Sequence, residues 1–271
     1  MGKNNNKMNI ISDYLNKCRQ IIDVVEKQSE DVRKAASWFA ETILSKRMVH
    51  VFGSGHNRIM VEEMWPRYGS FPGFNPIVEL SLTFHNLVVG ANGQRQAIFL
   101  ENVSGLAERI LRNFELNTKD TALIISSSGC NIVPIEMAEI FQKEGIKVVA
   151  LTTKKHSAGS SSKRKDGRKL SDFADLILDT GAPLGDAMIQ IPNLDTPVSP
   201  GSTVGGVMLI NSIKAEVAQL LTEAGQPPKV LSSAAIVGAE RAAQLFESAY
   251  DEHAHRLVEL YKSVGKTAGK E

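Results

Sequence analysis

The pattern of apolar and polar positions changes its period several times along the chain. From about Ile10 to Ser45, apolar residues recur every three, four and seven positions with charges between them, which predicts one or two amphipathic helices. Five later segments are instead short, nearly continuous apolar runs bounded by glycine or small polar residues, and such runs favour buried strands. The five runs are "RMVHVFGSG", "PIVELSL", "TALIISSSG", "IKVVALTT" and "ADLILDTG".

Segments with helical periodicity separate and follow these runs. They are "HNRIMVEEMWPRYG", "SGLAERILRNF", "NIVPIEMAEIFQKEG", "STVGGVMLINSIKAEVAQLLTEAG" and the long stretch from "SSAAIVGAE" to "VELYKSVGK". Strands that are apolar throughout and alternate with helices indicate a parallel sheet covered on both faces. We therefore predict an α/β fold with a doubly wound, mainly parallel sheet of about five strands.

The predicted elements divide the chain into three parts. Residues 1–47 form an N-terminal helical segment that packs on the α/β domain, residues 48–225 form that domain, and residues 226–271 form C-terminal helices. The amphipathic helices at the two ends carry more apolar surface than one small sheet can cover. We therefore expect a homodimer or a homotetramer.

Composition narrows the classes of partner. The 31 Lys and Arg residues nearly balance the 30 Asp and Glu residues, so the net charge gives no reason to expect nucleic acid or a membrane as a partner. No apolar run approaches the roughly 18 to 20 residues that span a bilayer, and the N-terminus lacks a signal-like apolar region, so we expect a cytoplasmic protein. Cys18 and Cys130 have neither CxxC nor Cys/His spacing, and we expect no metal and no cofactor.

Two strand ends share an unusual chemistry. "FGSGHN" and "SSSGCN" each place serine hydroxyls and glycine backbone directly before a helix, whose first N–H groups favour an anion. Such donors can surround the three terminal oxygens of a phosphate without a lysine, and a sulfonate would fit the same geometry. A serine that only caps the following helix is the alternative. The residues expected to bind substrate here are Ser54, His56, Asn57, Ser126, Ser127, Ser128 and Asn131.

Four segments resemble the SIS (sugar isomerase) family, specifically its single-domain phosphosugar-binding and phosphoheptose-isomerase-like branch. They are "VFGSGHNRIMVEEM", "ALIISSSGCNIVPIEMA", "KVVALTTKKHS" and "PGSTVGGVMLINSIKAEVA". The resemblance implies that the three serines after the third strand hold a sugar phosphate and that Ser54 faces the ligand. It also implies that Ser202 and Thr203 line the same cleft, although either could simply cap a helix.

The resemblance also supplies candidates for acid–base chemistry. An isomerase that works through an enediol needs a base to carry a proton between C1 and C2, and an acid to serve the oxygens. The resemblance places the catalytic glutamate at Glu63, which could instead lie on a solvated face or pair with a nearby arginine. It places a histidine acid or base at His253, although the surrounding sequence departs from the family pattern. Glu79 and His85 are further groups that could reach the cleft.

The favoured function is an aldose–ketose isomerase that acts on an anionic sugar with a terminal phosphate or sulfonate. A non-catalytic regulator that binds a sugar phosphate, and a lyase or deglycase on the same fold, are alternatives. The basic stretch from Lys154 to Leu170 predicts either a solvated loop or an electropositive rim near the fourth strand, with His156 exposed within it. His50, inside the first strand, is expected to be a satisfied core histidine.

Overall fold

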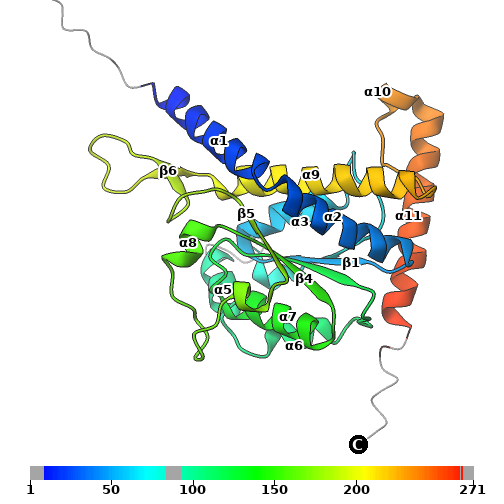
Figure 1. Ribbon diagram of the computed structural model, residues 1–271, viewed down its shortest axis with the longest axis horizontal. Helices are drawn as coiled ribbons and strands as arrows, with labels where there is room; N and C mark the ends of the chain where they lie inside the picture. Colours follow the sequence, from blue (N-terminus) through cyan, green and yellow to red (C-terminus); the bar gives the residue numbers. More distant parts are fainter. Residues whose placement is uncertain (1–8, 84–92, 263, 265–271) are drawn as a thin grey trace, which may run out of the picture.

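The computed structural model describes residues 9–83, 93–262 and 264, and it confirms the predicted parallel sheet (Figure 1). The five strands lie in the order β2-β1-β3-β4-β5, and each pairs in parallel with its neighbour. The winding order reverses between β1 and β3, which is where ligands bind in open α/β sheets. The strands are β1 (Val49–Gly53), β2 (Phe74–Ile77), β3 (Thr121–Ile125), β4 (Lys147–Thr152) and β5 (Leu176–Asp179).

The register places the ends of the two central strands side by side. Gly53 at the end of β1 pairs with Ile125 at the end of β3, so the loops that follow leave the sheet together. Side chains alternate between the two faces of the sheet: Leu123 belongs to one core cluster, whereas Ala122 and Ile124 belong to the other. Because both faces are buried, the strands appear in the sequence as continuous apolar runs.

Helices cover both faces of the sheet, as the doubly wound prediction requires (Figure 1). One face carries α2 (Ser29–Leu44), α3 (Arg58–Met64) and α9 (Ser202–Glu223), with α1 (Ile10–Glu26) packed along α9. The other face carries α6 (Leu106–Leu111), α7 (Ile132–Lys143) and a 3-10 turn at Leu170–Phe173. The C-terminal helices are α10 (Ala234–Val237) and α11 (Ala239–Tyr261).

The helix α9 is a core element. It is long and apolar enough to cross a membrane by length and composition alone, and it is the one such helix in the described part of the chain. Leu209, Ile210 and Ile213 are nevertheless fully buried in the core cluster that α9 shares with α2 and α3. A Cβ atom on Gly205 would lie 1.8 Å from the carbonyl oxygen of Thr180, just after β5. The apolar character of α9 therefore follows from its close packing on the sheet.

Several elements differ from those that the sequence predicts. The helix after β1 ends at Met64, because Trp65 precedes Pro66 and is extended, and a residue before proline disfavours the helical region. The structure adds three elements, which are α5 (Gly93–Leu100), α8 (Lys154–Ala158) and an antiparallel hairpin of β6 (Ala187–Ile189) and β7 (Val198–Pro200). The three-part division of the chain stays a prediction. Helix α2, in the N-terminal part, shares one core cluster with the sheet.

Candidate functional site

A cavity of about 210 Å³ opens where β1 and β3 end, at the reversal of the strand order. All seven residues that "FGSGHN" and "SSSGCN" nominate line this cavity, which we call the serine cavity. Their roles in binding stay predictions. The described lining residues are Ser54, Gly55, His56, Asn57, Gln94, Ile98, Glu101, Ser126, Ser127, Ser128, Asn131 and His156.

The serine turn, residues 126–131, closes upon its own backbone. The Ser126 hydroxyl oxygen accepts a hydrogen bond from the Gly129 N–H at 3.2 Å, and the Ser128 oxygen accepts one from the Cys130 N–H at 3.2 Å. Gly129 has a φ of 63°, which glycine adopts without steric cost. Because both serine oxygens act as acceptors within the turn, their hydroxyl hydrogens are left to donate to a ligand.

Ser127 connects the two loops of the cavity. Its hydroxyl donates to the Asn57 side-chain oxygen at 3.1 Å, and its oxygen lies 3.1 Å from Nε2 of His56. Since the Ser127 hydrogen is directed to Asn57, the contact with His56 requires Nε2 to carry a hydrogen. Burial lowers the pKa of His56, and the neighbouring His156 adds to this effect. Asp186 opposes the shift, but the lowered pKa still favours the neutral imidazole, with its hydrogen on Nε2.

Glu101 is the one carboxylate among the described lining residues. Its Oε2 accepts a hydrogen bond from the Ser54 hydroxyl at 2.7 Å, and its Oε1 accepts one from the Asn131 amide at 2.7 Å. Burial raises the pKa of Glu101, although the bond from Ser54 opposes the rise. No motif points to Glu101, because it follows α5 in a stretch where the sequence shows no strand or helix pattern.

The remaining polar groups of the cavity are neutral or weakly basic. His156 is half-buried rather than exposed as expected, and its Nδ1 accepts a hydrogen bond from the Gly185 N–H at 3.1 Å. No lysine or arginine is among the residues found to line the cavity in the described ranges. An anion here would be held by hydroxyl, amide and imidazole donors, and the electropositive rim stays a prediction.

Glu63 does not line the serine cavity. Its Oε1 accepts a hydrogen bond from the Asn211 amide of α9 at 2.8 Å, and its Oε2 forms an ion pair with Arg67. Burial alone would raise the pKa of Glu63, but the bonds from Asn211 and Arg67 lower it. It lines an open groove with Tyr68 and Phe246, which shares no lining residue with the serine cavity. Its catalytic role stays a prediction.

His253, Ser202 and Thr203 also lie outside the lining of the serine cavity. His253 packs against Trp65 with ring centroids 5.2 Å apart. The Ser202 hydroxyl donates to Asp186 at 2.7 Å, and the Ser202 N–H donates to the same carboxylate at 2.7 Å. Asp186 therefore receives the first N–H groups of α9, and Gly201 rather than Ser202 is the N-cap residue, so the expected capping role of Ser202 is not seen. Thr203 follows in the first turn of α9.

The other candidate groups fall into structural roles or outside the described residues. Glu79 accepts hydrogen bonds from Ser81 and lines a different cavity. His85 lies outside the described residues. His50 is fully buried and contacts Asp120 at 3.2 Å, so it fits the expected core histidine. Within residues 9–83, 93–262 and 264, no three His, Cys, Asp or Glu side chains gather where they could hold a metal ion.

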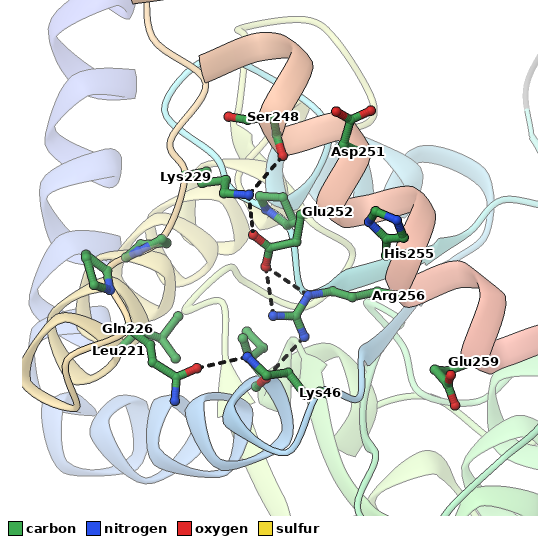
Figure 2. A pocket seen from close by; sticks show the side chains of 14 residues that line it. Lys46, Leu221, Gln226, Lys229, Ser248, Asp251, Glu252, His255, Arg256 and Glu259 are labelled. Carbon is green, nitrogen blue, oxygen red and sulfur yellow. Dashed lines mark hydrogen bonds and ion pairs between the residues drawn. The ribbon is translucent and has the colours of Figure 1, made fainter. Parts of the chain in front are cut away.

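A larger cavity of about 440 Å³ lies between the ends of α2 and α9 and the side of α11 (Figure 2). Its central charges are already paired with one another. Glu252 contacts Lys229 at 3.4 Å and Arg256 at 2.8 Å, and Arg256 also donates to the carbonyl oxygen of Ile43 at 3.1 Å. Because these charges neutralise each other, the serine cavity is the better candidate site.

Comparisons with known proteins agree on the fold. The chain matches the SIS domain over residues 13–153, just over half of its length. A UPF0309 protein of Halalkalibacterium halodurans is 34% identical over 222 residues, which cover 82% of this chain and 89% of the relative. A UPF0309 protein of Listeria innocua is 30% identical over 253 residues, covering 93% and 96% of the two chains. The solved structure of a phosphoheptose isomerase from Francisella tularensis shows the same fold, with a TM-score of 0.50 at 13% identity. The match covers 77% of this chain and 96% of the chain of the isomerase.

Proposed function

Because the chain belongs to the SIS domain family, we propose that it is an aldose–ketose isomerase acting on a sugar with a terminal oxyanion. The family supports a phosphosugar-related role, and the serine cavity supports the more specific proposal. The observation that carries it is the placement of Glu101. A half-buried carboxylate lies in the same small cavity as three consecutive serines and bonds to Ser54 and Asn131.

In this proposal the terminal oxyanion binds at the serine turn. The hydroxyl hydrogens of Ser126 and Ser128 are donors available there, and the Nε2–H of His56, which donates to Ser127, could turn to the anion if it leaves that partner. A phosphate and a sulfonate present the same three oxygens, so both belong to the proposed substrate class. With the oxyanion fixed on the hydroxyls of Ser126 and Ser128, the first carbons of the sugar would lie beside Glu101, which lines the same cavity and contacts Asn131 at the end of the turn.

Glu101 then serves as the base. Its ionised carboxylate takes the proton from C2 of the aldose while O1 gains a proton from solvent, which gives the enediol. The same carboxyl then returns its proton to C1 while O2 releases a proton to solvent, which gives the ketose. The raised pKa suits this exchange, because a carboxylate whose proton affinity is increased removes a carbon-bound proton more readily. Asn131 donates one amide hydrogen to Glu101 and has a second that could serve a sugar oxygen, whereas the single hydroxyl hydrogen of Ser54 is directed to Glu101.

The test uses isotope exchange. A panel of aldose phosphates and sulfonated aldoses is screened for thermal stabilisation of the protein, and the stabilising sugars are incubated in deuterated water. We expect deuterium at C2, and we expect Glu101→Gln to slow its incorporation by about 10²- to 10⁴-fold. Gln preserves both contacts, because its oxygen can accept from Asn131 while its amide donates to Ser54, so binding should persist.

Other variants separate the alternatives. Glu216→Gln is a matched control, because Glu216 forms only a 3.9 Å surface pair with Arg33. Loss of exchange in Glu63→Gln but not in Glu101→Gln would return the base to Glu63 and require it to act in the cavity of a second copy. Stabilisation without exchange would indicate a regulator, and cleavage of the sugar would indicate a lyase or deglycase.

Self-association is part of the proposal. Ile11 of α1 is 74% exposed, and Leu15 and Ile22 of the same helix are about half exposed. Phe246 and Val258 add exposed apolar surface on α11. Ile11, Leu15 and Ile22 recur at helical spacing along α1, and an exposed apolar helix face is typical of protein contacts, so we expect a dimer or tetramer. A monomer in sedimentation equilibrium at micromolar concentration would contradict this.

A further inference from the structure

The basic segment after α8 contacts the serine turn directly. We call residues 159–170 the clamped loop. Its Lys163 N–H donates to the carbonyl oxygen of Cys130 at 2.8 Å, and its Leu170 N–H donates to the carbonyl oxygen of Gly129 at 2.8 Å. The clamped loop thus binds two consecutive carbonyl groups that follow the three serines.

These two bonds orient the peptide groups of the turn. A trans peptide is planar, with its N–H opposite its C=O. Because the carbonyls of Gly129 and Cys130 point to the clamped loop, the N–H groups of Cys130 and Asn131 point away from it. The Cys130 N–H binds the Ser128 oxygen, and no hydrogen bond joins the Asn131 N–H to another described residue. The loop therefore sets the direction of the donors that the turn offers.

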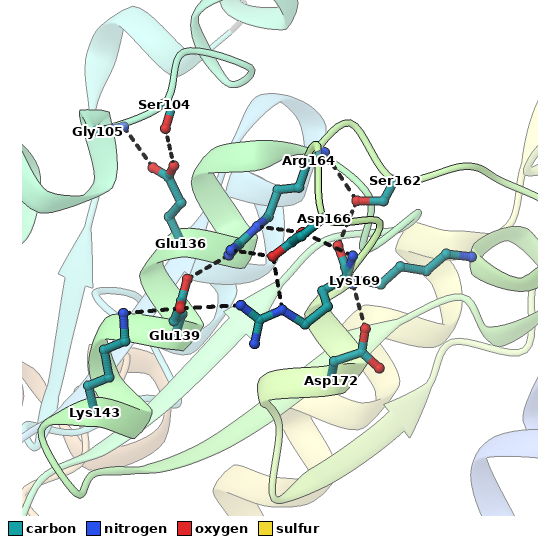
Figure 3. A network of polar contacts seen from close by, with 11 residues as sticks. Ser104, Gly105, Glu136, Glu139, Lys143, Ser162, Arg164, Asp166, Lys169 and Asp172 are labelled. Carbon is teal, nitrogen blue, oxygen red and sulfur yellow. Dashed lines mark hydrogen bonds and ion pairs between the residues drawn. The ribbon is translucent and has the colours of Figure 1, made fainter.

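Four charged residues hold the clamped loop on α7 (Figure 3). We call Glu139, Arg164, Asp166 and Arg168 the loop clamp. Arg164 donates to Glu139 at 2.6 Å and to Asp166 at 2.8 Å, and Arg168 donates to Asp166 at 2.9 Å. Both guanidinium groups lie over the buried ring of Phe173, at 5.2 Å and 4.5 Å. A connected, partly buried network of this kind holds a loop better than an isolated surface pair does.

Glu139 is the only member of the loop clamp that belongs to a helix. Its side chain is 16% exposed and receives Arg164 on Oε2, with Arg168 at 3.6 Å from Oε1. Glu136, one turn earlier, points to a different segment and accepts hydrogen bonds from Ser104 and the Gly105 N–H (Figure 3). The two carboxylates of α7 thus hold two separate segments near the serine cavity.

We propose that Glu139 is a positioning residue for the anion site. Through the loop clamp it holds the clamped loop against the serine turn, and so fixes the peptide groups of Gly129 and Cys130. The proposal rests on the proposed function only in expecting an oxyanion at the turn. Since Glu139 does not line the cavity, its removal changes the order of the turn and leaves every lining side chain in place.

The experiment compares Glu139→Gln with the unaltered protein. Amide hydrogen exchange is measured along the chain, and binding of inorganic phosphate and of sulfate is measured by calorimetry. We expect faster exchange at residues 126–132 and 159–170, and phosphate affinity weaker by on the order of tenfold, because the donors are no longer preorganised. The melting temperature should change much less than these local quantities, because Gln still accepts a hydrogen bond from Arg164 and the clamp holds one loop rather than the core.

Two variants on the same helix are matched controls. Lys143→Gln removes an outer partner of Glu139 that does not touch the clamped loop, so exchange and phosphate affinity should stay as in the unaltered protein. Glu136→Gln should raise exchange near residues 104–106 and leave the clamped loop protected.

Three results would overturn the proposal. One is faster exchange in the clamped loop with unchanged exchange in the serine turn and unchanged phosphate affinity. Another is unchanged exchange in both segments. The third is a general loss of protection that Glu139→Gln and Glu136→Gln share. If the unaltered protein binds neither anion, the proposed function fails, and exchange at residues 126–132 alone decides the role of Glu139.

Discussion

The close approach of α9 to the end of β5 makes a sharp prediction about two neighbouring glycines. In Gly205→Ala the new Cβ would lie 1.8 Å from the carbonyl oxygen of Thr180, a backbone atom that no rotamer change can move. In Gly206→Ala the new Cβ would lie 2.1 Å from the sulfur of Met60, which can swing aside. The two variants add the same methyl group to adjacent positions of one helix.

The magnitudes follow from these contacts. Real Cβ atoms essentially never come within 3.0 Å of another heavy atom, so α9 and Thr180 must separate by at least 1.2 Å in Gly205→Ala. Overpacking typically costs about 1 to 3 kcal/mol and more when backbone must move, whereas Ala in a helix gains about 1 kcal/mol over Gly. We therefore expect Gly205→Ala to lower the free energy of unfolding by about 3 kcal/mol, and Gly206→Ala to change it by less than about 1 kcal/mol.

Urea unfolding followed by circular dichroism measures both variants against the unaltered protein. A loss of about 3 kcal/mol corresponds to a fall of roughly 6 to 12 °C in melting temperature for a chain of this size. If the two variants agree within about 1 kcal/mol, the proposed backbone contact does not limit the packing of α9, and the reasoning is refuted.

Two further predictions concern pH. Because the pKa of Glu101 is raised in the folded protein, its ionised form disfavours folding. Glu101→Gln should therefore raise the melting temperature at pH 8, and this gain should shrink as the pH falls toward 5. A gain that grows on acidification would contradict this. Burial lowers the pKa of His56, whereas a bound anion favours the protonated form of its imidazole. Sulfate binding measured by calorimetry should therefore tighten from pH 8 to pH 6. His56→Gln should remove most of this change. The imidazole of His56 is also near the ionisable groups of Glu101, His156 and Asp186, so Glu101→Gln is measured in parallel. If His56→Gln leaves the pH profile of sulfate binding unaltered, the effect belongs to another residue.

The fold and half of the site follow from local patterns. A strand buried on both faces leaves a continuous apolar run, so four of the strands are identifiable, and the Gly- and Ser-rich loops after two of them predict the two walls of the serine cavity. The run "PIVELSL" is placed wrongly, because β2 is Phe74–Ile77 and Leu80–Leu82 forms a 3-10 turn. These loops are detectable because their chemistry lies in consecutive residues. The register of β1 and β3 then brings the two loops together.

The groups proposed for acid–base chemistry depend instead on contacts between distant segments. Glu101 reaches the serine cavity because α5, which it follows, lies against the 3-10 turn after β1, and nothing in its local sequence shows that approach. The local sequence also does not show which way the side chain of Glu63 points. Its neighbour Glu62 pairs with Arg58 on the surface, whereas Glu63 accepts a hydrogen bond from Asn211 of α9. Local periodicity places a residue on one face of a helix but does not predict which residues that face contacts.

No lysine or arginine is among the described lining residues of the serine cavity, and this has a consequence for the rate of ligand exchange. Hydroxyl, amide and neutral imidazole donors attract an anion strongly only at contact, whereas lysines and arginines also draw anions from a distance. The lining therefore gives an incoming anion no long-range attraction, and the ionised Glu101 carboxylate opposes its entry. A product that loses its alignment with the turn likewise meets no long-range pull and leaves readily, which would suit the proposed isomerase, because its substrate and product carry the same anionic group.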